Sequence, residues 1–586
     1  MKYSRIISMA ISAICTIALL CAFTPKNDKR INKQVERVLK QMTTREKIAQ
    51  LIFSQTDSYL FSEKHKEATN QLIEVEGIGG LLILQDSLPR YLNRMNELQS
   101  KSNIPLLIAI DGEWGPSMRF VEFPFFPQQM QLGALPNDSL IYEMGRAVAE
   151  QCKLANIHIN FAPVVDINVN PKNPVIHARS FGEDRDKVTT YARAYMRGMQ
   201  DGGIIACAKH FPGHGDTEVD SHKGLPILSF DRERLEQLEL YPFADQIKQG
   251  VKMVMIGHLL VPALDTTISS ISKPIITGLL KQEMGFDGIV VTDALAMKAV
   301  SNNRTSAEIA IAAYKAGVDI LLNPKDIKAA IDRIEEAINS GECSISDLDN
   351  RVRKILKVKA EYGMLDRQYS AIVDTTNISQ RAKNPEHIAL IQQMAEQSIT
   401  LVNNNANLVP INLTKKIAYI AYNAKHIAIK REYGSLEGIA GYNPNTGMVD
   451  STTLMYQHLQ KACISKNQNS VHYYSLDKTS SQTQINALCE DLEQYDVVIL
   501  ACHDPRGRIK RNLLSDEHIS SMGELVKKHR PILIHFGSPY GLSQLNWLDD
   551  TGAVIVSYQD SESNQRATAK ILTGEIKAKG QLPVSY

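Results

Sequence analysis

Residues 285–297 read GFDGIVVTDALAM, and no other stretch of the chain says more about the architecture. A glycine-containing turn leads into the run Ile289–Thr292, which is almost wholly apolar and ends at the carboxylate of Asp293. An apolar run without polar alternation predicts a strand covered on both faces, as in a parallel sheet flanked by helices. Taken alone, Asp293 fits two roles: the N-cap of the following helix, or a functional acid at a strand end.

The same pattern of apolar run, polar residue and helix recurs on both sides of this stretch. Further strands are predicted at residues 77–84, 105–110, 160–166, 204–208, 253–257 and 318–322. Strands that alternate with helices in this way predict a (β/α)₈ barrel of the TIM type over residues 32–365. In that fold the polar residues at the carboxyl ends of the strands converge on one site. The residues that follow or end the predicted strands are Asp111, Asp166, Lys209, His210, His258 and Asp293.

A second unit is predicted after the barrel. The polar stretch 366–386 is interpreted as a linker, and apolar runs follow at 417–421, 497–501, 532–536 and 553–556, with helical segments between them. This pattern favours a smaller α/β sandwich over residues 387–586. A chain of 586 residues is long enough for two such domains.

The N-terminus differs in kind from the rest. Lys2 and Arg5 precede the uncharged apolar run 6–23, and a polar exit follows. This order indicates an export signal over residues 1–25, and hence a periplasmic or cell-envelope protein. The run is also long enough for an uncleaved anchor, which would be the protein's one contact with the membrane. Cys21 raises lipidation as a third reading, although Leu20 before it is larger than the residue such signals carry.

The overall composition excludes some classes of partner and cofactor. The formal net charge is +1, so nothing suggests binding to nucleic acid. The cysteines are scattered, which predicts no disulfide framework, and neither a zinc-type cysteine spacing nor a nucleotide-binding glycine loop occurs. We therefore expect no cofactor.

Residues 209–222, KHFPGHGDTEVDSH, concentrate three histidines, three carboxylates and a lysine at a predicted strand end. Three interpretations are open. His222 could exchange protons near neutral pH, with Asp220 supporting its far ring nitrogen. The histidines and carboxylates could instead bind a metal, or the segment could be a solvated polar loop.

These segments resemble the N-acetylglucosaminidase branch of glycoside hydrolase family 3. The resemblance rests on residues 209–222 and 285–297, on NFAPVVDINVNPKNPVIHARSFGED at 160–184, on AIDGEWGPSMRF at 109–120 and, more weakly, on 579–585. It implies a two-domain exported glycosidase that needs no metal. It also implies a carbohydrate as substrate, while the oligomeric state is not readable from the sequence.

The resemblance assigns roles to matching positions. Asp293 matches the nucleophile, and His222 with Asp220 matches the acid/base pair. The positions that match sugar-binding residues are Asp111, Arg119, Arg179, Lys209 and His210. The implied reaction is retaining hydrolysis of terminal non-reducing β-N-acetyl-D-glucosaminides, with peptidoglycan fragments as the expected source.

Two departures from the family pattern stand out. Glu113-Trp114-Gly115-Pro116 replaces a Glu-Gly-Gly-Arg run, so contacts at the rim of the sugar site are expected to differ. Ala294 stands where a second acid often follows the nucleophile. Trp114 itself could stack on a sugar or simply pack.

Other enzymes and a binding protein compete with this interpretation. A family 3 phosphorylase would use phosphate in place of water, and a histidine donor suits it because a carboxylate would repel phosphate. A family 3 β-glucosidase, a metal-dependent hydrolase and a catalytically dead sugar-binding protein also compete with it. His258 is interpreted as a wall or structural residue, Asp166 as an organiser of the barrel mouth, and His214 and Asp216 as residues that shape the loop.

Overall fold

The structure is a computed structural model. It describes residues 25–56, 62–424, 442–443, 448–449, 453–465, 471–504, 509–510 and 513–586. All but the last residue of the predicted export segment 1–25 lies outside the described residues, and the first described helix, α2, is Pro25–Leu39. Within the described part, no helix combines the length and the apolar character that crossing a bilayer requires.

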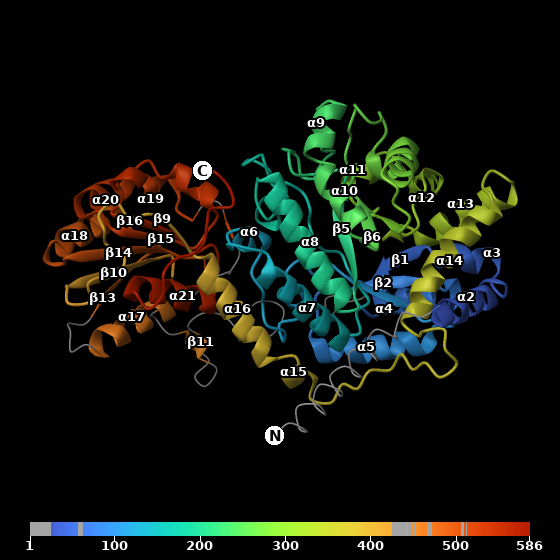
Figure 1. Ribbon diagram of the computed structural model, residues 1–586, viewed down its shortest axis with the longest axis horizontal. Helices are drawn as coiled ribbons and strands as arrows, with labels where there is room; N and C mark the ends of the chain where they lie inside the picture. The colour runs from blue at the N-terminus through green and yellow to red at the C-terminus, as the bar shows by residue number, and fades with distance from the viewer. Residues whose placement is uncertain are drawn as a thin grey trace, which may run out of the picture.

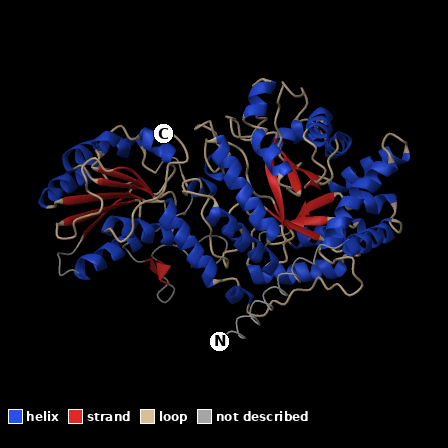
Figure 2. Cartoon of the chain, viewed as in Figure 1, coloured by secondary structure: helices blue, strands red, loops and turns tan. Residues whose placement is uncertain are grey.

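A parallel sheet of eight strands forms the first domain (Figures 1 and 2). Its order is β7-β6-β5-β4-β3-β2-β1-β8, and a parallel bridge between Val291 and Ile320 joins the two remaining edges. This closure confirms the predicted (β/α)₈ barrel. The strands are β1 (Ile52–Gln55), β2 (Gly80–Leu82), β3 (Leu107–Ile110), β4 (Ile159–Asn160), β5 (Ile205–Phe211), β6 (Met253–Ile256), β7 (Ile289–Thr292) and β8 (Leu321–Leu322).

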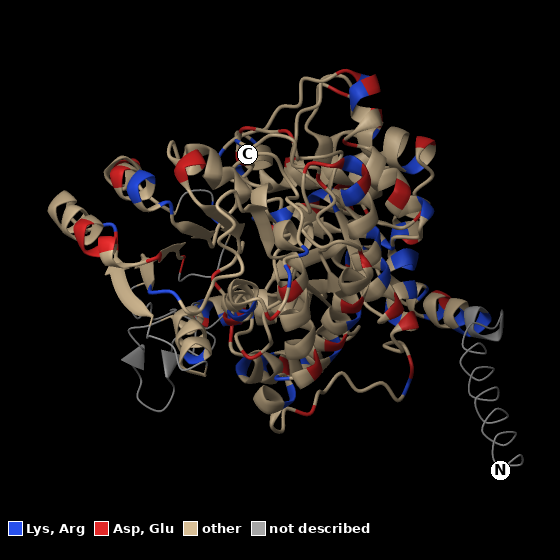
Figure 3. Cartoon of the chain, turned by 60° about the vertical axis from the view of Figure 1, so that its left-hand side comes forward, with Lys and Arg blue, Asp and Glu red and all other residues tan. Residues whose placement is uncertain are grey.

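Helices surround the barrel and cover the outer faces of its strands (Figure 1). Several begin at a capping side chain, as where Asp184 accepts from the Lys187 N–H and where Thr305 and Glu308 form a capping box. The main ones are α5 (Leu88–Lys101), α7 (Ser139–Leu154), α8 (Arg185–Asp201), α10 (Tyr241–Lys248), α12 (Ser306–Ala316), α13 (Ile327–Asn339) and α14 (Ile345–Glu361). Lys, Arg, Asp and Glu are mixed along these outer helices (Figure 3).

The predicted strand 160–166 is mostly irregular in the structure. Only Ile159–Asn160 is a strand, and Val164 makes a single bridge with Lys209. Pro163 has no N–H to donate to a neighbouring strand, which explains why the ladder stops early. The apolar residues are nevertheless buried, as the prediction required.

A second sheet, of order β13-β10-β14-β15-β16-β9, forms the second domain. All its pairs are parallel except β16 with β9. Two hydrophobic clusters cover its two faces, so the predicted α/β sandwich is confirmed. The strands are β9 (Thr400–Asn403), β10 (Ile417–Tyr422), β13 (His472–Leu476), β14 (Val497–Cys502), β15 (Ile532–His535) and β16 (Ala553–Val556).

The helix α16 (Pro385–Ser398) lies between the two sheets (Figure 1). It contacts α7 on the barrel side and α21 (Glu562–Thr573) in the second domain. His387 on α16 donates from Nε2 to Glu150 on α7, with 3.1 Å between nitrogen and oxygen. The segment before α16 packs on the barrel. There the Val373 N–H donates to Asn96 Oδ1, and the Val373 carbonyl accepts from Asn96 Nδ2. The predicted limits 366 and 386 of the linker stay predictions.

Candidate active site

Polar side chains from three barrel strands meet at the carboxyl edge of the sheet. Asp111 directly follows β3, Lys209 and His210 lie in β5, and Asp293 directly follows β7. Because the strands are parallel and their hydrophobic flanks are buried in one core, these polar groups share one end of the barrel.

Lys209 is a buried cation held by two carboxylates. Its Nζ donates to Asp111 Oδ1 at 2.8 Å and lies 3.0 Å from Glu113 Oε1. Burial alone would lower the pKa of Lys209, but the charges of Asp111 and Glu113 raise it above its usual value. Arg119 lies farther off, with 3.9 Å between its Nη2 and Asp111 Oδ2. Both Asp111 and Arg119 are partly exposed, so they line the mouth of the site.

Arg179 joins this cluster from the loop after β4. It makes a two-pronged contact with Glu113, 3.0 Å from Nε and 2.7 Å from Nη2. Burial would raise the pKa of Glu113, but Arg179 and Lys209 hold it far below its ordinary range. The cluster therefore pairs the cations Lys209 and Arg179 with the anions Glu113 and Asp111.

His210 is fixed by a bond at each ring nitrogen. Its Nδ1 lies 2.8 Å from Asp166 Oδ2, and its Nε2 lies 3.2 Å from Arg179 Nη2. Because a carboxylate accepts and a guanidinium donates, these bonds place the proton on Nδ1 and leave Nε2 as an acceptor. Asp166 also accepts from the backbone N–H groups of His210 and His214. This agrees with the interpretation of Asp166 as an organiser of the barrel mouth.

Asp293 is half-buried among groups that favour its charged form. Burial opposes ionisation, but electrostatic interactions with His258 and His210 lower its pKa below the usual value. The Ala294 N–H adds to this effect by donating to Asp293 Oδ1 at 2.7 Å. The side chain is thus held as a carboxylate, the form that a nucleophile requires.

His258 supports the chain just after Asp293. It is fully buried, its Nε2 donates to the Ala294 carbonyl at 3.0 Å, and its Nδ1 lies 2.7 Å from Ser270 Oγ. Burial lowers the pKa of His258, although the charge of Asp293 opposes this. These contacts agree with its interpretation as a structural residue of the site wall.

His222 and Asp220 lie on the loop after β5. His222 Nδ1 is 2.9 Å from Asp220 Oδ1, and the same oxygen accepts from the His222 N–H. The imidazole is 67% exposed, and Asp220 is 22% exposed. Ser221, between them, accepts from the N–H of Ala299 at 3.3 Å, so the loop lies against α11 (Lys298–Ser301), shortly after Asp293. His222 is also close enough to His258 to lower its pKa.

The side chains of the histidines in residues 209–222 have different hydrogen-bond partners. His210 is bound to Asp166 and Arg179, His214 lies 2.7 Å from Thr217 Oγ1, and His222 is bound to Asp220. Over the described part of the chain, no group of three or more histidine, cysteine or carboxylate side chains could hold a metal ion. The described residues therefore contain no geometry that favours the metal interpretation.

Trp114, the departure from the family pattern, is half-buried in the barrel core. Its ring lies 6.1 Å from that of Phe125, and its indole nitrogen is buried with no hydrogen-bond partner among the described residues. These surroundings favour the packing role over stacking on a sugar.

From the sequence, Glu113 stood out only within the run 113–116, which departs from the family pattern. Its pairing with Lys209 and Arg179 was not predicted. A signal was present, because Glu113 follows the strand-end Asp111 by two residues. Its partners, however, are far away in the chain. The roles of Asp293, His222, Asp220, Asp111, Arg119, Arg179, Lys209 and His210 stay predictions, but the structure shows where each lies.

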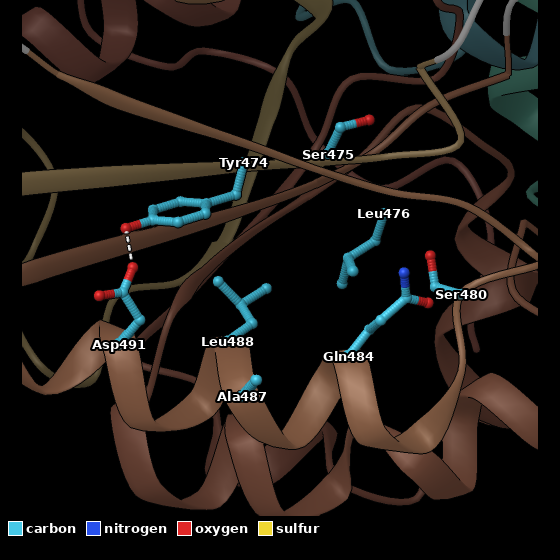
Figure 4. Close-up of a pocket in the computed structure, with 8 residues that line it drawn as sticks. All are labelled: Tyr474, Ser475, Leu476, Ser480, Gln484, Ala487, Leu488 and Asp491. Atoms are coloured by element: carbon cyan, nitrogen blue, oxygen red, sulfur yellow. Dashed lines mark hydrogen bonds between the residues drawn. The ribbon is translucent and has the colours of Figure 1, made fainter.

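A pocket of about 310 Å³ occurs elsewhere, on the second domain between β13 and α18 (Gln482–Asp491) (Figure 4). Tyr474 and Asp491 close one end of it by a mutual hydrogen bond, and Tyr474 also lies 2.9 Å from the hydroxyl of Tyr495. Ser480 and Gln484, which also line it, bond to the backbone N–H groups of Asp477 and Ser481, and the pocket contains none of the predicted site residues. The barrel mouth remains the candidate active site.

Comparison with known proteins places this chain in a family. The model of the glycosyl hydrolase family 3 N terminal domain matches residues 43–358, and that of the glycosyl hydrolase family 3 C-terminal domain matches residues 399–586. Among the relatives, Beta-hexosaminidase A of Pseudoalteromonas piscicida is 29% identical over 561 residues, which is 88% of this chain and 90% of that protein.

Two more similarities differ in how much of the chain they cover. Beta-hexosaminidase LpqI of Mycobacterium tuberculosis is 33% identical over 295 residues, 48% of this chain and 76% of that protein. The solved structure of a glycoside hydrolase family 3 beta-N-acetylglucosaminidase from Paenibacillus sp. str. FPU-7 is 28% identical. It superposes with a TM-score of 0.73 over 93% of this chain and 99% of that one. The first family model alone matches more than half of the chain, so the chain belongs to glycosyl hydrolase family 3 and is a glycosidase.

Proposed function

We propose that this glycosidase removes terminal non-reducing β-N-acetyl-D-glucosamine residues with retention of configuration, as a β-N-acetylhexosaminidase. The observation that carries the proposal is the contrast at the barrel mouth between an ionised, half-buried carboxylate, Asp293, and an exposed imidazole, His222, on the adjoining loop. The names of the relatives, Beta-hexosaminidase and beta-N-acetylglucosaminidase, support this choice of sugar.

The first step forms a covalent intermediate. Asp293 attacks the anomeric carbon and forms an ester bond to it, while the bond from that carbon to the leaving oxygen breaks. The Nε2–H of His222 gives its proton to the leaving oxygen. Asp220 accepts from Nδ1–H and stabilises the imidazolium before the transfer.

The second step reverses these roles. Neutral His222 takes a proton from water, and the water oxygen attacks the anomeric carbon and displaces Asp293. A histidine can act in both directions because both protonation states are accessible near neutral pH. Asp111 and Arg119 would hold the sugar hydroxyls, since they lie at the partly exposed side of the cluster, and the buried Lys209, ion-paired with Asp111, would assist them.

We also propose that the enzyme acts in the cell envelope. The basic start, the apolar run 6–23 and the polar exit support export, so the substrate would be a glycan of the cell envelope, namely peptidoglycan fragments. Fractionation of the host cell, with N-terminal sequencing of the mature protein, tests this. A protein found in the cytoplasm with Met1 retained would overturn the proposed location.

One set of assays tests the reaction. Initial rates are compared on an aryl β-N-acetylglucosaminide, the matching β-glucoside and purified muropeptides, and proton NMR follows the anomer released first. We expect turnover of the N-acetylglucosaminide and the muropeptides, with the β-anomer appearing first. Release of the α-anomer would exclude retention, and preference for the glucoside would exclude the proposed sugar.

Two further arms separate the rival mechanisms. Repeating the assay with inorganic phosphate should leave the product as the free sugar, whereas a sugar phosphate would reveal a phosphorylase. A chelator should leave the rate unchanged, and loss of activity restored by a metal would reveal metal dependence.

A further inference from the structure

The second domain reaches the barrel through a continuous hydrophobic cluster. Met130, Ala134 and Ala178 of the barrel belong to the same buried cluster as Tyr540 and Val584 of the second domain. Ala178 directly precedes Arg179, a member of the candidate site. The interface between the domains is therefore also the outer wall of the segment that carries Arg179.

Tyr540 makes a polar contact across this part of the interface. Its hydroxyl donates to the Asn168 carbonyl at 3.1 Å and accepts from Asn168 Nδ2 at 2.9 Å. Its ring lies 5.8 Å from the ring of His177. Tyr540 is only 4% exposed, so water does not compete with these bonds.

Asn168, in turn, fastens the segment that carries Arg179. Its Oδ1 accepts from the His177 N–H at 2.9 Å, at the start of the 3₁₀ turn His177–Arg179. Its own N–H donates to the Gly182 carbonyl at 2.9 Å, just beyond that turn. These two bonds hold the segment both before and after Arg179. Asn168 is also fully buried.

From this sequence of contacts we propose that Tyr540 is a positioning residue of the sugar site, through which the second domain sets the place of Arg179. The hydroxyl fixes Asn168, Asn168 fixes the turn His177–Arg179, and Arg179 fixes Glu113 and the Nε2 of His210. The inference rests on the proposed function, because it takes the Arg179 cluster as the part of the site that binds the sugar.

The first test is Tyr540→Phe, which removes the hydroxyl and keeps the ring in the interface. A small displacement of a group that binds ground state and transition state alike raises KM and leaves kcat nearly unchanged. We expect KM for an aryl β-N-acetylglucosaminide to rise about 3–10-fold, the effect of about one hydrogen bond, with kcat within about twofold.

Tyr558→Phe is the matched control. It also removes a buried tyrosine hydroxyl from the second domain, but its partner, Thr400 Oγ1 at 2.8 Å, belongs to the same domain. Both variants should melt at similar temperatures, and only Tyr540→Phe should raise KM. An equal rise of KM in both variants, or no rise in Tyr540→Phe, would overturn the proposal.

A double-mutant cycle gives a second readout. In an Arg179→Ala background, Tyr540→Phe should change KM no further, because the group through which it acts is gone. Independent, additive effects on KM would contradict the proposed route. If the unmodified enzyme does not hydrolyse the N-acetylglucosaminide, the proposed function fails. If it does, and KM is the same in Tyr540→Phe as in the unmodified enzyme, only this inference fails.

Discussion

The barrel mouth contains two histidine–aspartate pairs that differ in almost nothing except burial. His210 Nδ1 lies 2.8 Å from Asp166, and His222 Nδ1 lies 2.9 Å from Asp220. The first ring is 6% exposed and bonded at both nitrogens, whereas the second is 67% exposed and lies on a loop. The same chemical pair is therefore a fixed support in one place and, in the proposed mechanism, a proton carrier in the other, and the surroundings make the difference.

Asp293 should matter most, because the proposed mechanism gives it the covalent bond to the anomeric carbon. We expect Asp293→Ala to lower kcat by about 10⁴-fold or more on every substrate, since no other described carboxylate replaces it at the end of β7. The rate is measured on an aryl β-N-acetylglucosaminide and on muropeptides. Substantial turnover of either substrate would remove Asp293 as the nucleophile.

His222→Ala tests whether the exposed pair acts in the reaction and not in stability. It should lower kcat by about 10²–10⁴-fold on glycosides whose leaving group needs a proton, and far less on activated aryl glycosides. Its melting temperature should stay near that of the unmodified protein, because the ring is exposed. Equal slowing of both substrate types would argue against His222 as the proton donor.

His210→Ala should show the opposite balance. Removing one member of a buried pair leaves Asp166 without its side-chain partner, which costs about 3 kcal/mol in the free energy of unfolding. Chemical denaturation measures this, with His222→Ala as the control of equal side-chain change. If the two variants lost the same stability, burial would not distinguish the pairs and the comparison would fail.

Glu239 should change stability by no more than His210 does, and its effect should depend on pH. It lies under the loop of His222, where a Cβ on Gly213 would approach its side chain to 2.7 Å, and Arg234 bridges it to Asp216. Burial raises the pKa of Glu239 from 4.5 to about 7, although Arg234 opposes this. Between these two pH values the folded protein keeps a proton that the unfolded chain has released, so Glu239 lowers stability as the pH rises.

Glu239→Gln removes this penalty. At pH 8 the variant should be more stable than the unmodified protein by up to about 3 kcal/mol, and the difference should shrink toward zero near pH 4.5. Denaturation at both pH values measures it. A gain in stability that is the same at both pH values would show that the titration of Glu239 is not its source.

Much of the fold could be predicted from the sequence, because buried parallel strands are continuous apolar runs that end at polar residues. The runs before Asp111 and Asp293 show this directly. The strand β13 was not predicted. It lies at an edge of its sheet, so its polar and half-exposed residues carry no such run.

The candidate site could be predicted only in part. Strand-end residues such as Lys209 share one mouth by the geometry of a barrel, whatever their partners are. The contact between Glu113 and Arg179 and that between Asn168 and Tyr540 join residues far apart in the sequence. No local pattern encodes such pairs, because they depend on how loops and domains pack together.

Residues 581–583, which bond to the barrel, have a consequence for how the chain folds as it is translated. Gln581 donates its N–H to the Ala134 carbonyl, and the Pro583 carbonyl accepts from the N–H of Glu183, just after the segment that carries Arg179. A ribosome makes the barrel before it makes these residues. A nascent barrel that is otherwise complete would therefore wait, with one wall of its candidate site uncovered, until residues 581–583 have been made.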